Sequence, residues 1–188
     1  MPPKQKITKE ALLACAYEIT EQQGIAAVTS LSVARVAGCS IQPVFSHFPT
    51  MEALRQETFQ YACQQFLKEV MVWSDRPDFP ALLSKWTLDL ARNRPNLYKL
   101  LYLSDGFQEK SMGSMMMDFD SNQAAVARMQ QAYGLSKEDC LDILVRSCLL
   151  LMGISTMICV NHMEISDEEA LSMMQRTVKD MVEGRKQK

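Results

Sequence analysis

The sequence predicts an all-α protein of about nine helices. Apolar residues recur every three or four positions through most of the 188 residues, and no stretch alternates apolar and polar residues as a strand would. Serine and threonine precede several of these runs, as helix N-caps do, and prolines fall where helices begin. The chain is 47% hydrophobic and 22% charged, which is typical of a folded globular protein.

The first predicted element is a helix over residues 8–24. Thr8 is placed to begin it, and Leu12, Ala16 and Ile19 recur on one face. Gly24 follows the last periodic residue, which is where helices commonly stop. The spacing therefore predicts one amphipathic helix whose apolar face lies against other elements.

Two short helices joined by a tight turn at Gly38 come next. Thr29 or Ser30 is expected to cap the first, and Ser40 the second. Pro43 falls in the first turn of the second helix, where a missing backbone N–H costs no helical hydrogen bond. The proline therefore supports the helix assignment.

The rest of the chain continues as helices separated by proline, glycine and serine. Thr50 is a natural cap for a helix that reaches about residue 73, and residues 74–80 carry two prolines and form a bend. Ser136 and Ser166 each begin a capping signature before an apolar run, and residues 105–114 are loop-like. The helices predicted beyond residue 80 span 81–93, 95–103, 115–133, 136–162 and 166–183.

Residues 24–48 are the most informative for function. The second of the two short helices is amphipathic, with apolar and small polar residues expected on opposite sides. The apolar side is predicted to hold Val44, Phe45 and Phe48, and the polar side Ser40, Gln42, Ser46 and His47. A short helix held on an apolar base, with small polar groups facing outward, fits a DNA major groove.

Several short elements follow one another at fixed spacing between residues 7 and 54. They are Glu21-Gln-Gln-Gly24, Val33-Ala34, Ala37-Gly38-Cys39-Ser40, Phe45-Ser-His-Phe48 and Glu52-Ala-Leu54. In this order they resemble the TetR-type bacterial transcriptional regulators. The residue types agree with that arrangement, because Ala34 is small where two helices cross and Gly38 allows a left-handed turn. Cys39, Val44 and Phe48 are expected to fill the small core beneath the second short helix.

The resemblance implies a three-helix helix-turn-helix DNA-binding domain over residues 1–49 and a helical effector-binding and dimerisation domain over residues 50–188. Gln42 is the best candidate for a base contact, because its amide can pair bidentately with adenine. Ile41 and Pro43 are placed to touch thymine methyl groups. The remaining residues are expected to contact and position the phosphates, and Phe45 does so through its main chain. The residues expected to face DNA are Thr29, Ser30, Ser40, Ile41, Gln42, Pro43, Phe45 and His47.

Two departures from the family pattern affect the phosphate contacts. Phe45 stands where the family often has tyrosine, and Met51 where it often has lysine. The formal net charge is −2, so the chain as a whole does not attract phosphate and any affinity needs a local basic surface. The basic groups near this segment are Lys4, Lys6, Lys9, Arg35 and Arg55, with several glutamates among them. Few neutralised phosphates predict a shallow salt dependence for each half-site.

The helix expected near residues 140–162 is apolar nearly all round, as in a helix covered on both sides. Together with the last helix it predicts a four-helix interface between two copies of the chain. The residues assigned to this homodimer interface are Cys148, Leu151, Met152, Ser155, Cys159, Met174 and Val178.

Aromatic residues and methionines suggest an adaptable apolar pocket in the C-terminal part. Tryptophan and tyrosine each add one polar tip to an apolar wall, and thioethers adapt to irregular shapes. The residues assigned to the pocket are Trp73, Trp86, Tyr98, Tyr102, Met116 and Phe119. They predict a small effector that is uncharged or weakly polar. Ordinary core packing is the alternative explanation for the same residues.

Other chemistries find little support in the sequence. There is no nucleophile–base pattern, glycine-rich phosphate loop or paired-carboxylate motif, so no enzyme activity and no cofactor are expected. The six cysteines lack zinc-type spacing, and neither histidine has neighbours suited to a metal. The longest apolar run, residues 147–160, is shorter than the ~20 residues of a membrane span. Without a signal peptide pattern, a cytoplasmic protein with no membrane partner is expected.

The leading functional prediction is a dimeric repressor that binds a palindromic operator in double-stranded DNA and is released by a small apolar effector. A helical interaction module whose DNA-binding face has weakened is an alternative, because basic residues are sparse. A thiol-sensing regulator is another, because Cys148 and Cys159 lie roughly on one helical face. The operator sequence, the regulated genes and the effector have no signature in the chain.

Overall fold

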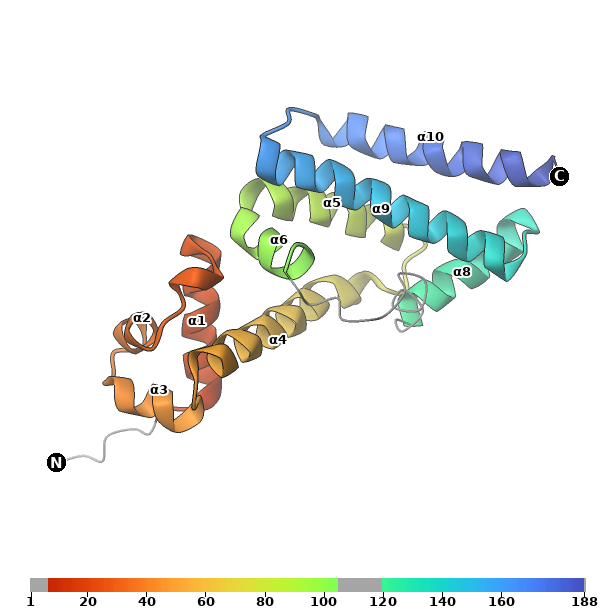
Figure 1. Ribbon diagram of the computed structural model, residues 1–188. Coiled ribbons are helices and arrows are strands. Elements are labelled where there is room, and N and C mark those ends of the chain that lie inside the picture. The colour runs from red at the N-terminus through yellow and green to blue at the C-terminus, as the bar shows by residue number, and fades with distance from the viewer. Residues whose placement is uncertain (1–6, 105–119, 188) are drawn as a thin grey trace. The chain divides into compact units, whose positions relative to one another are not determined.

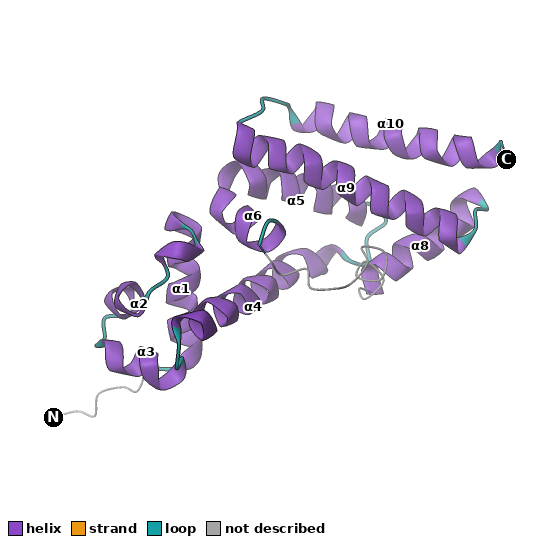
Figure 2. Ribbon diagram, viewed as in Figure 1, coloured by secondary structure: helices purple, strands orange, loops and turns teal. Residues whose placement is uncertain are grey.

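The computed structural model describes residues 7–104 and 120–187, and this part of the chain forms helices joined by loops and turns, with no strand (Figure 2), which confirms the predicted all-α fold. Figure 1 labels nine α-helices in it. Their bounds are α1 (Lys9–Gln23), α2 (Ser30–Val36), α3 (Ile41–His47), α4 (Met51–Val70), α5 (Phe79–Asn93), α6 (Pro95–Tyr102), α8 (Asp120–Tyr133), α9 (Lys137–Asn161) and α10 (Asp167–Lys186). Two 3₁₀ turns, η1 (Ile25–Ala27) and η2 (Met71–Trp73), follow α1 and α4.

Side-chain caps set the starts of several helices where the sequence predicts them. The Thr8 hydroxyl accepts a hydrogen bond from the backbone N–H of Ala11 (3.2 Å), and Thr29 and Ser32 form a reciprocal capping box. Ser166 forms a second capping box with Glu169. Ser40 occupies the N-cap position of α3, but its hydroxyl makes no capping hydrogen bond. The start of α3 therefore depends on the turn before it and on packing.

Contacts divide the chain into two compact units. We call the first the head, which comprises Met1–Glu69 and Arg94–Ser104, and the second the body, which comprises Val70–Asn93 and Asp105–Lys188. The predicted boundary between residues 49 and 50 does not coincide with this division. The head keeps nearly all of α4 because Leu54 is fully buried in its core, and it also takes α6 from further along the chain.

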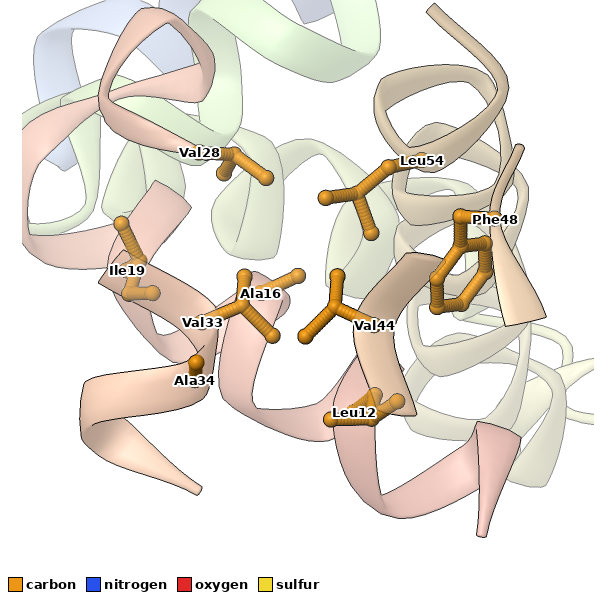
Figure 3. Packing of buried hydrophobic residues seen from close by; sticks show 9 residues of the cluster. All are labelled: Leu12, Ala16, Ile19, Val28, Val33, Ala34, Val44, Phe48 and Leu54. Carbon is orange, nitrogen blue, oxygen red and sulfur yellow. The ribbon is translucent and has the colours of Figure 1, made fainter. Parts of the chain in front are cut away.

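The core of the head fixes the positions of α1, α2, α3 and the start of α4. Val44 and Phe48 have no solvent exposure and anchor α3, and Ala34 on α2 is 3% exposed, as expected for a close helix crossing. Cys39 is only partly buried and packs at the edge of this core. The buried cluster consists of Leu12, Ala16, Ile19, Val28, Val33, Ala34, Val44, Phe48 and Leu54 (Figure 3).

The turn between α2 and α3 depends on Gly38, whose φ of +65° lies in the left-handed region. The backbone N–H of Cys39 donates to the carbonyl oxygen of Ala34 (3.0 Å), which closes the end of α2. A Cβ atom added at Gly38 would meet nothing within 4 Å. A side chain at position 38 would therefore destabilise the protein through its unfavourable backbone conformation, and not through clashes with neighbouring atoms.

Arg94 attaches α6 to the end of α1 within the head. Its guanidinium donates to the Glu21 carboxylate (2.6 Å) and to the Tyr17 hydroxyl (2.7 Å), and it pairs more weakly with Glu69 (3.3 Å). The Asn96 amide donates to the backbone carbonyl oxygen of Glu21 (3.1 Å). We call this group of hydrogen bonds the Arg94 clamp. It joins residues more than 70 positions apart in the sequence.

The body is built around α9, which packs against α5, α8 and α10. Ile143, Ile154 and Ile158 are among its buried residues. By length and composition α9 is also apolar enough to cross a membrane, with a third of its most apolar window buried. Arg185 near the end of α10 pairs with Asp139 and Asp142 at the start of α9, and Arg92 on α5 pairs with Asp167 (2.7 Å).

We expect Gly38→Ala to lower the free energy of unfolding by about 1–2 kcal/mol, because a residue with a Cβ pays a steric cost in the left-handed region. Urea unfolding followed by circular dichroism measures this change. Gly184→Ala is the matched control, since Gly184 lies inside α10 with open space around it and needs no positive φ. Equal midpoints for Gly38→Ala and the parent protein would contradict the role given to this turn.

We expect Arg94→Ala to lower the free energy of unfolding by about 1–3 kcal/mol, because it leaves Glu21 and Tyr17 without their charged donor. The control is Arg76→Ala, which removes an equally short pair with Asp78 (2.8 Å) whose side chains are more than half exposed. An exposed pair contributes little, so this variant should unfold at nearly the parent midpoint. Equal losses in the two variants would show that the Arg94 clamp is not special.

Candidate DNA-binding surface

The outer face of α3 is the candidate recognition surface. Ile41 is 46% exposed and Phe45 is 48% exposed, and Gln42 is exposed beside them. Val44 and Phe48 hold α3 against the head core. The prediction that Phe45 points inward with these two residues is wrong. Phe45 follows Val44 directly, and a single helical step of about 100° is enough to carry its ring out of the core.

Six of the eight residues predicted to face DNA lie in one short segment, which consists of α3 and its N-cap Ser40. Ser40 is exposed, and Pro43 and His47 are half-buried on the flank away from Phe45. Thr29 and Ser30 lie at the start of α2, where Thr29 is exposed and Ser30 is half-buried. The Thr29 hydroxyl already accepts a hydrogen bond from the backbone N–H of Ser32 (3.1 Å), so it holds the helix start in place.

Two polar side chains of α3 are engaged within the head. The Ser46 hydroxyl donates to the backbone carbonyl oxygen of Gln42 (2.9 Å), which turns it back toward the helix. His47 Nε2 lies 3.3 Å from the carbonyl oxygen of Ile7 and ties the end of α3 to the residues before α1. These contacts leave the Gln42 amide as the extended polar group on the outer face.

The cations of the head serve mainly its own structure. Lys9 pairs with Glu57 (2.5 Å), and Arg55 donates to the backbone carbonyl oxygens of Val28 (3.3 Å) and Ala26 (3.5 Å). Arg35 is exposed in the last turn of α2. Lys4 and Lys6 lie outside the described residues. No local pattern predicts the role of Arg55, because its partners are backbone atoms 27 and 29 positions away.

The predicted effector pocket is not gathered in one unit. Tyr98 is fully buried in the head and stacks on Tyr102, with ring centroids 5.0 Å apart. Trp73 and Trp86 belong to the body. Met116 and Phe119, the two other residues assigned to the pocket, lie outside the described residues. The stacked tyrosines therefore form part of the packing of α6 in the head.

An open pocket of about 540 Å³ lies in the body where α9 ends and α10 begins. Its walls include Arg92 of α5, Ile158 of α9, His162 at the C-cap of α9, and the connecting residues 163–166. His162 ends α9 in the left-handed conformation (φ 55°). Sequence reasoning missed this pocket, because nothing in the pattern indicates that α5 reaches the connection between the last two helices.

Three of the residues predicted to form a dimer interface are buried within the single chain. Leu151 is 8% exposed, Cys159 is 5% exposed and Ser155 is not exposed at all, so placing them on a partner-facing surface was wrong. They lie on the side of α9 that packs inside the body. The other predicted interface residues, Cys148, Met152, Met174 and Val178, are half-buried. The exposed apolar residues of α9 and α10 are Leu149, Met157, Val160 and Met173.

Burial makes Cys148, one of the two cysteines of the thiol-sensor hypothesis, a poor nucleophile. It raises the pKa of Cys148 to about 11, so the thiolate is scarce near neutral pH. Cys159 is buried on the same helix. Their separation of 11 positions corresponds to about 16 Å along the helix, well beyond the reach of a disulfide. The structure gives this hypothesis no support.

The part of the chain that the structure describes contains no cluster of three or more His, Cys, Asp or Glu side chains able to hold a metal ion. The chemistry that α3 offers is therefore that of its amide, hydroxyl, imidazole and apolar side chains.

Comparisons with known proteins find similarity among solved structures. No protein-family model matches the chain, and no curated protein is similar to it. Among solved structures, the chain is similar to a TetR transcriptional regulator from Rhodococcus sp. RHA1, with 18% sequence identity and a TM-score of 0.45. The similarity covers 92% of this chain and 93% of that one.

Proposed function

We propose that this protein is a TetR-like DNA-binding transcriptional regulator that acts as a dimeric repressor. The observation that carries the proposal is the support of α3: Val44 and Phe48 are fully buried beneath it while Gln42 is exposed on its outer face. A short helix fixed from below and following a tight turn is how helix-turn-helix proteins present residues to the major groove. Residues 7–54 resemble the sequence pattern of that family.

In this proposal α3 enters the major groove and Gln42 reads a base. Its amide offers one acceptor and two donors, which match N6 and N7 of adenine. Thr29, Ser30, Ser40, His47 and the main chain of Phe45 position the sugar–phosphate backbone. Because Lys9 and Arg55 are engaged inside the head, each half-site binds with few neutralised phosphates and a shallow salt dependence.

Two heads bound together compensate for this weak attraction, so the proposal includes a homodimer on a palindromic operator. The exposed apolar residues Leu149, Met157 and Val160 recur at helical spacing on α9, and Met173 on α10 adds to them. Contact between two such faces would bury apolar area that water otherwise covers. This arrangement also accounts for the hydropathy of α9 in a cytoplasmic protein.

Release from the operator is assigned to a small effector bound in the body. An effector shifts the equilibrium only when it binds the DNA-free state more tightly than the DNA-bound state. The small apolar effector predicted from the aromatic residues remains part of the proposal.

The test of DNA binding is selection of duplexes from a random library by the full chain, followed by gel-shift titration of the selected sequence. We expect Gln42→Ala to weaken binding by about 10- to 100-fold, which corresponds to about 1–3 kcal/mol for a bidentate base contact. Gln64→Ala is the matched control, because Gln64 is an exposed glutamine on α4, away from α3.

Failure to select any duplex at low salt would overturn the proposed function and favour a helical interaction module. Equal binding by Gln42→Ala and Gln64→Ala would show that DNA is bound through another surface.

The oligomeric state is tested by sedimentation equilibrium of the full chain in detergent-free buffer. We expect a dimer for the parent protein and a shift toward monomer for Val160→Asp, because a carboxylate placed in an apolar interface loses its water without gaining a partner. Val72→Asp is the control: Val72 is 72% exposed, even more than Val160 at 48%, and lies outside α9 and α10. A monomer at every concentration, or a chain that stays soluble only in detergent, would contradict the assignment of this face.

A further inference from the structure

The exposed surface of α3 is partly apolar. Ile41 and Phe45 are each nearly half exposed although both are large hydrophobic residues. They are four positions apart, so they stand on the same side of the helix about 6 Å apart along its axis. Together they form an apolar edge, which we call the Ile41–Phe45 edge.

This edge cannot turn inward. Val44 and Phe48 have no solvent exposure and lock the adjoining side of α3 into the head core. His47 is tied to Ile7, and the backbone N–H of Phe48 donates to the carbonyl oxygen of Val44 (2.8 Å) at the helix end. Any relief from exposure must therefore come from a partner that lies against α3.

The position of the edge indicates what that partner offers. Gln42 is exposed on the same helix, about 60° round from Phe45, and α3 carries no lysine, arginine or carboxylate. In a major groove the base edges present hydrogen-bonding groups and a single kind of apolar group, the C5-methyl of thymine. A mixed surface of one amide and two apolar side chains therefore matches adenine and thymine on neighbouring base pairs.

We propose that the Ile41–Phe45 edge reads thymine methyl groups, so that the side chain of Phe45 is a specificity determinant of the half-site. This inference rests on the proposed DNA-binding function. The spacing of about 6 Å along α3 is close to two base steps of about 3.4 Å. The half-site should thus contain two thymines about two steps apart, beside the A·T pair that Gln42 contacts.

The test replaces each thymine of the selected duplex with deoxyuridine, which removes one methyl group and leaves base pairing unchanged. For the parent protein we expect substitution at two positions in each half-site to weaken binding about fourfold each, the effect of losing one buried methyl. Elsewhere in the duplex the replacement should have no effect.

The assignment of each methyl comes from combining this replacement with protein variants. In Phe45→Ala and Ile41→Ala, deoxyuridine should no longer weaken binding at the thymine which that side chain contacts, whereas Val72→Ala should behave as the parent. Both residues are exposed, so thermal unfolding should show that the variants remain folded.

The outcomes separate the two proposals. If no duplex is selected, the DNA-binding function itself fails. If a duplex is bound but deoxyuridine has no effect at any position, or has the same effect in Phe45→Ala and Ile41→Ala as in the parent, the methyl readout is overturned while DNA binding stands. The apolar edge would then belong to a protein partner.

Discussion

The burial of Val44 and Phe48 is the constraint on which the recognition surface depends. A helix of seven residues is too short to be stable by itself, so its position comes from packing and not from its own hydrogen bonds. The two side chains enter a cluster supplied by α1, α2 and α4, with Leu12 and Leu54 equally buried (Figure 3). Once these two are fixed, helical geometry decides where every other residue of α3 points.

The charges of the head are consistent with a surface that discriminates between sequences more than it attracts phosphate. Its described cations near α3 are largely committed to Glu57 and to backbone carbonyl oxygens. Non-specific attraction to DNA depends on such cations, so a head of this kind gains little from arbitrary sequence. In the proposed regulator, DNA affinity and sequence selectivity therefore both depend on dimerisation through the bodies, which places two heads on one operator.

Much of the fold could be predicted from local signals, because caps and turns involve residues close together in the sequence. Thr8, Thr29 and Ser166 lie where capping chemistry requires them, and Gly38 has the positive φ that the turn demands. The prediction that Phe45 lies on the buried side of α3 was wrong. In a helix of two turns, the next residue along the chain is rotated by about 100°, which is enough to move a side chain from the buried side to the exposed side. The other residues assigned to the DNA-facing side of α3 came from the family resemblance, and their contacts with DNA stay a prediction.

What the sequence could not supply are relations between distant segments. A helix that is apolar all round, such as α9, does not reveal which side its own chain covers, so Leu151 and Cys159 were assigned to an interface although they are buried within the chain. The aromatic residues assigned to one pocket are divided between two units, because composition carries no information about which helices meet.

The Arg94 clamp means that the head is not one continuous piece of polypeptide. Residues 7–69 emerge from the ribosome first, but α6 emerges only after α5, which belongs to the body. Until Arg94 has been synthesised, Glu21 and Tyr17 lack their partner, and the end of α1 has no cover from α6. In many proteins an N-terminal domain folds completely before the next domain is synthesised. The head of this protein cannot follow that order, because it is completed by residues that come after α5. A fragment that stops at residue 69 reproduces only this unfinished state, so the recognition surface is best studied in the whole chain.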